Sequence, residues 1–384
     1  MFRWLFLMWC VLVLGHPVQA EEDLLNTAKS ISYTAIDLGP LMDSMNHWRK
    51  RYGRDRVDRK YDETQIVFIA ENMLGLQNAD GGWPKDVDWQ IDIHPDTVRA
   101  IKGQSSLRST LDNRTTYTQV TYLSKVFEAT GLERYRESSR RGLDYILREQ
   151  RPGGGWRGWD VDAITYNDDV MLGTMRTLKE IAEGAPHFAW VDADTRAKAN
   201  SALNRAIDVT LKCQIVVRGE KTAWCQQHDH QTLLPTQARS YELPSICPAE
   251  SVGIVQFLME IDHPSPEIID AITHAMAWFE ASKITGIRLE RIQVDATRFK
   301  DHTATTDLVV VADPEAPPLW ARFHEIDSFR PFMCNRDGVK VYSLAEVALE
   351  RRTGYGWYGG WPRRLIDKGY PEWRAKHQLT DGEN

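Results

Sequence analysis

The sequence has few cysteines and no strong excess of either charge, and both shortages limit what the protein can be. Its 384 residues carry 54 acidic and 47 basic side chains, a formal net charge of −7 at pH 7. Binding to nucleic acid needs a basic surface that neutralises phosphates, so we expect no nucleic-acid partner. The last four cysteines are separated by 12, 22 and 87 residues, and these intervals match no zinc-binding pattern.

Those four cysteines leave the redox state open. They are Cys213, Cys225, Cys247 and Cys334, and in an exported protein they allow three complete pairings. Cys213 and Cys225 are the closest pair along the chain and could bridge a helix end to a loop. Buried free thiols are an equally good alternative.

Long apolar segments are missing except at the N-terminus. Arg3 precedes an apolar run from Leu5 to Leu14, and Val18 to Ala20 has the small residues of a cleavage site. The run is too short to cross a bilayer, and no later stretch reaches about 18 consecutive apolar residues. We therefore expect residues 1–20 to be a signal peptide and the mature chain to be secreted, to the periplasm or the medium, without a membrane span.

Aromatic residues are abundant, with 14 Trp and 13 Tyr, which fits either core packing or the aromatic walls of a carbohydrate groove. Two of the tryptophans close a repeated segment, because QNADGGW at 77–83 recurs as QRPGGGW at 150–156, 73 residues later. Each copy ends a predicted helix, and the glycines are best explained as C-caps beside a packed indole. Repeated helical pairs that close on themselves are typical of an α/α toroid.

Helical periodicity dominates the first two-thirds of the chain. Helices are predicted at 65–76, 116–130, 135–150, 168–183, 193–213, 250–261 and 266–282. Strand patterns are scarce, and the best are 308–311 and 340–342. We therefore predict a mainly α protein. Its mature part, 21–384, forms one catalytic domain, with a helical toroid over about 50–283 and an irregular, partly β lobe over about 284–384 packed on it.

Two acidic segments precede predicted helices and are candidates for cation binding. Asp112 and Asn113 come before the helix at 116–130, and Asp168 and Asp169 come at the start of the helix at 168–183. In each case N-capping is the simple structural explanation. Carboxylate and amide oxygens are also the ligands that calcium prefers. In a toroid, alternate helix ends face one rim, so we infer that the two segments can meet across a cleft.

Three arginines in the second half could serve an acidic substrate. Arg239 lies in a loop close to Glu242, so a structural ion pair is the simple alternative. Arg322 and Arg336 follow proline-rich sequence in the C-terminal lobe. Arginine binds carboxylates in a bidentate way, although surface salt bridges explain these two residues equally well.

Taken in order, several segments resemble the pectate lyases of polysaccharide lyase family 10, and the resemblance runs from about Asn72 to Trp373. The most specific segments are DNRTTYTQ (112–119), ITYNDD (164–169), WCQQHD (224–229), ARSYELPS (238–245), ESVGIVQFLM (250–259) and PPLWARFHEI (317–326). The resemblance implies an α/α toroid with an irregular second lobe. It also implies a secreted, monomeric lyase that cleaves polygalacturonate by calcium-assisted β-elimination and yields 4,5-unsaturated products.

The resemblance also implies roles for single residues. Asp112, Asn113 and Asp168 correspond to calcium-associated residues, Arg239 to the catalytic base, and the pair Arg322 and Arg336 to contacts with substrate carboxylates. An arginine base is chemically awkward, because its ordinary pKa exceeds about 12. An alkaline working pH answers this, and nearby cations would lower the pKa further.

Two other features bear on the site. His228 and His230 would be easier bases near neutral pH, and an H-x-H pair by itself is a weak zinc signal. Gln256 stands where relatives often have a basic residue, which predicts the loss of one carboxylate contact.

Other functions compete with this one. A glycoside hydrolase on the same toroid would use Asp112 and Asp168 as acid and base. A terpene-cyclase-like toroid would share the repeats at 77–83 and 150–156, but the signal peptide and the absence of a DxDD motif argue against it. A non-catalytic pectin-binding protein is disfavoured because Arg239 is retained.

Overall fold

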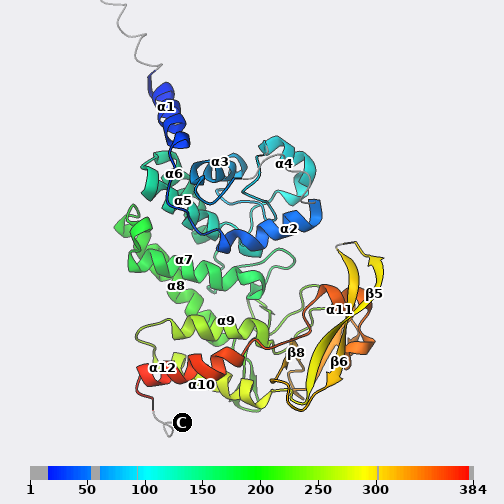
Figure 1. The fold of residues 1–384 in the computed structure, drawn as a ribbon. Coiled ribbons are helices and arrows are strands. Elements are labelled where there is room, and N and C mark those ends of the chain that lie inside the picture. The colour runs from blue at the N-terminus through cyan, green and yellow to red at the C-terminus, as the bar shows by residue number, and fades with distance from the viewer. Residues whose placement is uncertain (1–15, 53–60, 93, 301, 380–384) are drawn as a thin grey trace, which may run out of the picture. The chain divides into compact units, whose positions relative to one another are not determined.

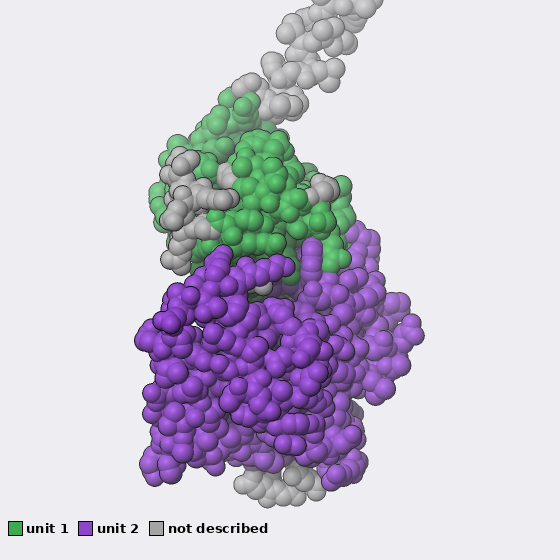
Figure 2. Space-filling model, turned by 90° about the vertical axis from the view of Figure 1, so that its right-hand side faces the viewer, with its two compact units in different colours: residues 1–109, 115–145, 184–191 green, residues 110–114, 146–183, 192–384 purple. Residues whose placement is uncertain are grey.

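The computed structural model describes residues 16–52, 61–92, 94–300 and 302–379 (Figure 1). Most of the expected signal peptide, residues 1–15, lies outside the described residues, and helix α1 (His16–Ser30) begins within its last part. The chain divides into two compact units (Figure 2). Unit 1 consists of residues 1–109, 115–145 and 184–191, and unit 2 of residues 110–114, 146–183 and 192–384. No helix among the described residues is long and apolar enough to cross a membrane.

Unit 1 is built from helices and short 3₁₀ turns. Its elements are η1 (Gly39–Leu41), α2 (Met42–Tyr52), α3 (Ile66–Leu76), α4 (Pro95–Lys102), η3 (Gln104–Ser106), α5 (Tyr117–Thr130), most of α6 (Glu133–Glu149) and η6 (Pro186–Phe188). α3 is apolar over most of its length and packs against α5. Helix α5 ends at Gly131, which has a left-handed backbone with a φ of 70°. The Gly131 N–H donates to the Phe127 carbonyl and so caps the C-terminus of the helix. Helix α6 then leads from unit 1 into unit 2.

Unit 2 contains the remaining helices. They are α7 (Val170–Glu183), α8 (Ala193–Lys212), α9 (Pro248–Met259), α10 (Pro266–Ala281), α11 (Leu349–Gly354) and α12 (Tyr370–Lys376), with a π-turn η8 (Leu365–Gly369) before α12. α7 packs along α8, and α9 packs on both α7 and α10. Asp192 caps α8 by accepting the Thr195 N–H at 2.8 Å, and Ser265 caps α10. All seven helices predicted from periodicity are confirmed to within a few residues, whereas α2, α4, α11 and α12 were not predicted.

The repeated glycine-rich segments are structural turns, as their sequence predicted. Gly81 and Gly154 have φ values of 94° and 103°, and a Cβ at either would lie within 2.3 Å of a neighbouring backbone oxygen. The indole N–H groups of Trp83 and Trp156 each donate to a carbonyl ten residues earlier, at 2.8 Å. Both rings are fully buried. The two repeats therefore fasten equivalent helix ends, one in each unit.

Unit 2 also carries the strands, and the longest are β5 (Ile287–Arg298) and β6 (Thr303–Ala312). They form an antiparallel ribbon in which Ile287 faces Ala312. The short pairs are β1 (Ile164–Thr165) with β4 (Gln227–His228), β2 (Val216–Val217) with β3 (Glu220–Lys221), and β7 (Trp320–Ala321) with β11 (Tyr358–Gly359). A small sheet has the order β10 (Lys340–Val341), β9 (Pro331–Cys334), β8 (Phe323–His324). Both predicted strands are found, in β6 and β10, and β5 was missed.

Cys213, Cys225, Cys247 and Cys334 are free and buried. The proposed bridge between Cys213 and Cys225 is therefore absent, and the alternative of buried thiols holds. Burial raises the pKa of the Cys213 thiol to about 12, so this group stays protonated.

Candidate functional site

Two turns with strained backbones meet in unit 2. They are η4 (Asp112–Arg114) and η5 (Asn167–Asp169), and each directly precedes a helical segment. Asn113 and Asp168 have φ values of 51° and 52°, in the left-handed region that non-glycine residues seldom adopt. The turns pack against each other, and Arg114 Nη2 lies 2.6 Å from Asp169 Oδ2. The inference that the two acidic segments meet is thus confirmed, and backbone strain of this kind is a mark of functional sites.

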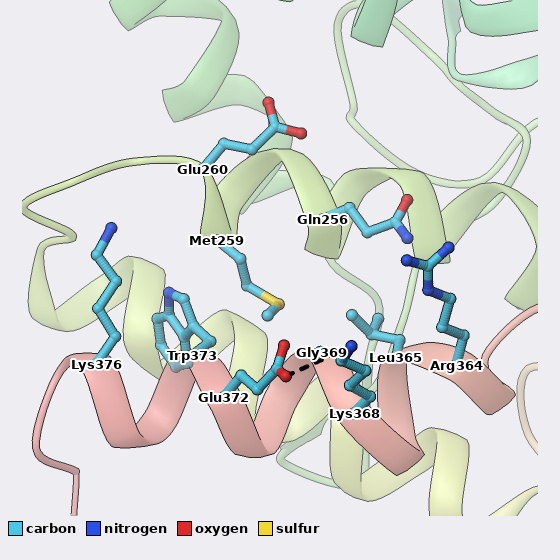
Figure 3. Close-up of a pocket in the computed structure, with 10 residues that line it drawn as sticks. All are labelled: Gln256, Met259, Glu260, Arg364, Leu365, Lys368, Gly369, Glu372, Trp373 and Lys376. Atoms are coloured by element: carbon cyan, nitrogen blue, oxygen red, sulfur yellow. Dashed lines mark ion pairs between the residues drawn. The ribbon is translucent and has the colours of Figure 1, made fainter.

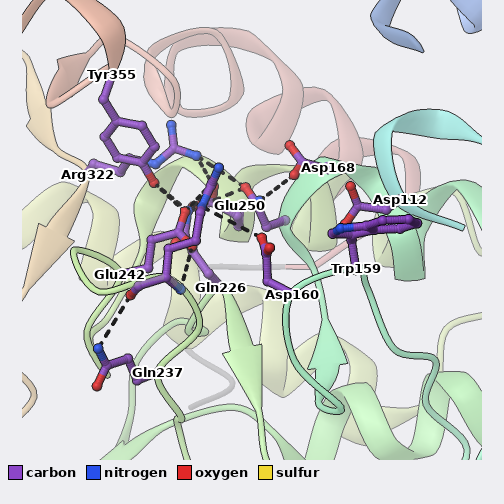
Figure 4. Close-up of polar contacts among 12 residues, drawn as sticks. Asp112, Trp159, Asp160, Asp168, Gln226, Gln237, Glu242, Glu250, Arg322 and Tyr355 are labelled. Carbon is purple, nitrogen blue, oxygen red and sulfur yellow. Dashed lines mark hydrogen bonds and ion pairs between the residues drawn. The ribbon is translucent and has the colours of Figure 1, made fainter. Parts of the chain in front are cut away.

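Capping does not explain Asp112 and Asn113. Helix α5 begins at Tyr117, its N-cap is Thr116, and neither Asp112 nor Asn113 occupies the cap position. The Asp112 carboxylate instead accepts the backbone N–H of Trp159 at 2.9 Å and is only 5% exposed. The loop that follows Trp156 therefore holds this carboxylate in place. Figure 4 shows Trp159 next to Asp112.

Gly158 leaves the space that the Asp112 carboxylate fills. A Cβ at this position would lie 3.0 Å from Asp112 Oδ2 and 2.9 Å from Thr165 Cγ2. We expect Gly158→Ala to push the loop and the carboxylate apart and to lower the free energy of unfolding by about 1–3 kcal/mol, measured by urea denaturation. Gly153→Ala is the matched control, because the nearest atom to its Cβ would be 3.5 Å away. Equal midpoints for the two variants would contradict this account.

Asp168 is linked to the rest of the cluster through Asn167. The Asn167 amide donates to Asp168 Oδ2 at 2.6 Å. Its carbonyl oxygen lies 3.5 Å from both Arg322 Nη2 and Gln226 Nε2. One buried amide therefore connects the acidic turn η5 to the arginine of the lobe that contains β7 and β8.

Arg322 lies in a buried polar group with Glu250 and Tyr355. It forms an ion pair with Glu250 in the first turn of α9, and its guanidinium lies 4.7 Å from the centre of the Tyr355 ring. Burial alone would lower the pKa of Arg322, but the charge of Glu250 outweighs it and raises the pKa, so the guanidinium stays charged. Arg322 Nε, Glu250 Oε2 and Gln226 Oε1 are buried without a hydrogen-bond partner. Such orphaned polar atoms are costly unless a ligand satisfies them.

Arg239 forms a bidentate pair with Glu242, as the sequence allowed. Arg239 Nε donates to Glu242 Oε2 at 2.8 Å, Nη2 pairs with Oε1, and the Arg239 backbone N–H also donates to Oε2 at 3.2 Å. The Tyr355 hydroxyl donates to Glu242 Oε1 at 3.0 Å, and Asp160 Oδ2 lies 4.0 Å from Arg239 Nε. Figure 4 shows Asp160, Asp168 and Asp112 on one side of this group. Arg239 thus lies in the same cluster as the acidic turns.

Glu242 stabilises the charged form of Arg239. Burial alone would lower its pKa, but the hydrogen bonds and the charge of Glu242 outweigh burial and raise the pKa above its ordinary value. The suggestion that nearby cations lower this pKa concerns a bound ion and stays a prediction. The guanidinium is charged at neutral pH.

Arg336 lies beside the Tyr241 ring and pairs with Glu350. Its guanidinium is 5.5 Å from the centre of the Tyr241 ring, and that of Arg239 is 5.2 Å from the same ring. Arg336 also forms a bidentate pair with Glu350, at 3.0 and 2.8 Å. Arg336 and Arg239 therefore both lie near the same aromatic ring.

The two histidines are not suited to act as bases. His228 is fully buried, burial lowers its pKa to about 4, and its Nε2 accepts the Cys225 N–H at 3.0 Å. Burial also lowers the pKa of His230, whose Nε2 lies 3.5 Å from Asp162 Oδ1. Within the described ranges, no three His, Cys, Asp or Glu side chains are grouped closely enough to hold a metal. Both the histidine base and the zinc reading therefore lose support.

The residues that fit a hard cation are Asp112, Asn113 and Asp168. They offer two carboxylates and one amide oxygen from two turns that pack together. This donor set is the chemistry that calcium prefers.

Sequence reasoning missed Gln226, Glu250, Tyr355, Trp159 and Asp160. Gln226 and Glu250 stand inside the segments WCQQHD and ESVGIVQFLM, so the motifs themselves contained the signal. Tyr355, Trp159 and Asp160 lie outside every motif. They join the site only through loops that the fold brings to it.

A second groove lies between α9 and α12, away from the Arg239 cluster (Figure 3). Its volume is about 600 Å³. It is lined by Gln256, Met259, Glu260, Arg364, Leu365, Lys368, Gly369, Glu372, Trp373 and Lys376. Gln256 lines this groove, and the loss of a carboxylate contact at this position stays a prediction.

Comparisons with known proteins agree with this site. The profile of the pectic acid lyase family matches residues 77–366. A solved structure of a mutant family 10 polysaccharide lyase from Cellvibrio cellulosa, in complex with trigalacturonic acid, is similar with a TM-score of 0.68 and 26% identity. The match covers 88% of this chain and 99% of that one. A second structure of the family 10 enzyme from Cellvibrio cellulosa has a TM-score of 0.65, 26% identity and coverage of 88% and 98%.

No protein with a curated description matches the chain. The structural matches and the helical hairpins described above confirm the predicted fold class, a mainly α chain of the α/α toroid type with an irregular, partly β C-terminal lobe.

Proposed function

Because the chain belongs to the pectic acid lyase family and is a polysaccharide lyase, we propose that it cleaves polygalacturonate by calcium-assisted β-elimination. The products would be 4,5-unsaturated oligogalacturonates. The observation that carries the proposal is the meeting of Asp112, Asn113 and Asp168 with Arg239 in one polar cluster of unit 2. The oligogalacturonate bound in the similar Cellvibrio enzyme supports the same substrate.

The chemistry explains why these side chains are needed together. The C5 proton of a galacturonate unit is weakly acidic, because the neighbouring carboxylate is already negative. A calcium ion held by Asp112, Asn113 and Asp168 would supply positive charge to that carboxylate and to the enolate-like transition state. The base then takes the C5 proton, the electron pair forms the C4–C5 double bond, and the C4–O bond breaks. The leaving oxygen takes a proton from water, and the protonated base then releases the C5 proton to the hydroxide that remains, so no water is consumed overall.

The chain's own residues divide the remaining tasks. Arg322 binds a substrate carboxylate, and its unpartnered Nε is a donor that such a ligand would satisfy. Arg336 binds a second substrate carboxylate. Arg239, in its neutral form, accepts the C5 proton. Since Glu242 keeps Arg239 charged, the proposal implies an alkaline working range.

Residues 1–20 have the features of a signal peptide, so we propose that the enzyme acts outside the cytoplasm as a secreted monomer. An extracellular or periplasmic location gives it access to plant pectate, a polymer that does not enter cells. Comparing the N-terminal residue of the exported protein with that of the full chain would test the predicted cleavage after Ala20.

The direct test is purified protein with polygalacturonate, with and without a calcium chelator. We expect ultraviolet absorbance from the conjugated double bond to rise only when calcium is available, and to return when calcium is added back. New reducing ends without absorbance would instead indicate hydrolysis, the chemistry of a glycoside hydrolase that uses Asp112 and Asp168. Binding without either signal would indicate a pectin-binding protein.

A further inference from the structure

The Glu242 carboxylate, which pairs with Arg239, is buried and accepts several hydrogen bonds. Glu242 is only 1% exposed, although the Arg239 side chain is 37% exposed. Its oxygens receive the Arg239 Nε and Nη2, the Arg239 backbone N–H and the Tyr355 hydroxyl. The Tyr355 oxygen in turn accepts the Gln226 amide at 3.2 Å. Glu242 is therefore fixed from several sides before any substrate binds.

The Glu242 carboxylate makes it harder for Arg239 to act as a base. A bidentate carboxylate favours the charged guanidinium, and only a neutral guanidine can accept a proton. Loss of a proton from Arg239 would give up the attraction of Glu242. The same contact also fixes the direction of the Arg239 side chain, which a general base needs as much as its charge state.

We propose that Glu242 is a positioning residue that sets both the orientation and the protonation state of Arg239, and that Tyr355 moderates it. This inference rests on the proposed function. The Tyr355 hydroxyl donates to Glu242 and so shares the negative charge that Arg239 experiences. Burial raises the pKa of Tyr355, so the hydroxyl keeps its proton and remains a donor over the working range.

Other charged groups also face Arg239, and none of them contacts it as closely as Glu242 does. Asp160 lies 4.0 Å away on the loop after Trp156. The rings of Tyr241 and Tyr355 lie 5.2 and 6.0 Å from the guanidinium carbon. The cations Arg336 and Arg351 lie 5.5 and 4.8 Å from the centre of the Tyr241 ring, and Arg322 lies 4.7 Å from the centre of the Tyr355 ring. Glu242 is the closest charge and the one whose removal should change Arg239 most.

The test is the pH dependence of kcat/KM on polygalacturonate at saturating calcium. In this profile kcat/KM should rise with pH as Arg239 loses its proton, and we call this rise the alkaline limb. For Glu242→Gln we expect the alkaline limb to move to lower pH by about 1–2 units, because the neutral guanidine forms more easily without the carboxylate. For Tyr355→Phe we expect the limb to move in the opposite direction, by about half a unit, because Glu242 then keeps its full charge for Arg239.

Glu260→Gln is the matched control. Glu260 also pairs with an arginine, Arg176, at 3.1 Å, but outside the cluster, so its removal should leave the limb in place. A uniform fall in rate at every pH for Glu242→Gln, with no displacement of the limb, would overturn the proposal. If Glu242→Gln does not fold, an unmoved or lowered limb for Tyr355→Phe would overturn it instead. Wild-type protein that makes no unsaturated product at any pH would refute the proposed function, which is a separate outcome.

Discussion

Replacing Arg239 with alanine should lower kcat/KM on polygalacturonate by about 10³-fold, the middle of the range expected for loss of a general base. The fold should survive, because Glu242 would still receive the backbone N–H of residue 239 and the Tyr355 hydroxyl, at 3.2 and 3.0 Å. The buried carboxylate would then keep hydrogen-bond partners, and the arginine side chain is itself partly exposed. Initial rates by ultraviolet absorbance, with circular dichroism and a thermal midpoint, provide the measurement.

Arg336→Ala is the informative comparison for this experiment. Both arginines face the Tyr241 ring, but only Arg239 joins the hydrogen-bonded cluster. Removal of Arg336 should raise KM several-fold and leave kcat within a factor of about three, because it takes away a binding charge and not the base. If Arg239→Ala keeps more than a tenth of the wild-type kcat, or if the two variants lose rate equally, Arg239 is not the base.

The helices were predictable because their signal is local. α3 and α7 have apolar residues that fall on one face at helical spacing, and this pattern needs no knowledge of the rest of the chain. Strand β5 has no such signal. Most of its residues are exposed on both faces, so its conformation depends on the ladder that it forms with β6. A ribbon without a buried face leaves little pattern in its sequence.

Only the site residues that lie inside sequence motifs could be predicted, and the contacts between the motifs could not. Asp112, Asp168 and Arg239 each lie in a distinctive segment, but the contacts that join these segments span large distances along the chain. Arg322 and Asn167 are 155 positions apart, and Gln226 and Tyr355 are 129 apart. Packing decides such pairings, and no periodicity within one segment reports them. The rise in the pKa of Arg239 could not be predicted for the same reason, since it depends on the hydrogen bonds and the charge of Glu242 in the folded loop.

Loss of the Asp168 charge should have the second large effect, and asparagine is the substitution that isolates it. Asp168 has a φ of 52°, and asparagine adopts this left-handed conformation more readily than other residues, so the turn η5 should keep its shape. Asp168→Asn keeps a donor oxygen but removes one of the two carboxylate charges. Because calcium affinity depends on the number of charged ligands, we expect calcium binding to weaken on the order of 10²-fold.

The consequence for activity follows from that affinity. At limiting calcium, Asp168→Asn should be nearly inactive, and a large excess of calcium should restore part of the rate. Calorimetric titration of calcium into the protein without substrate measures the affinity independently of turnover. Asp169→Asn is the control, since the neighbouring carboxylate pairs with Arg114 at 2.6 Å and should cost stability rather than calcium affinity. A wild-type rate that is indifferent to a chelator, or equal calcium affinities for the two variants, would mean that the paired turns hold no catalytic cation, and the strain at Asn113 and Asp168 would then require another explanation.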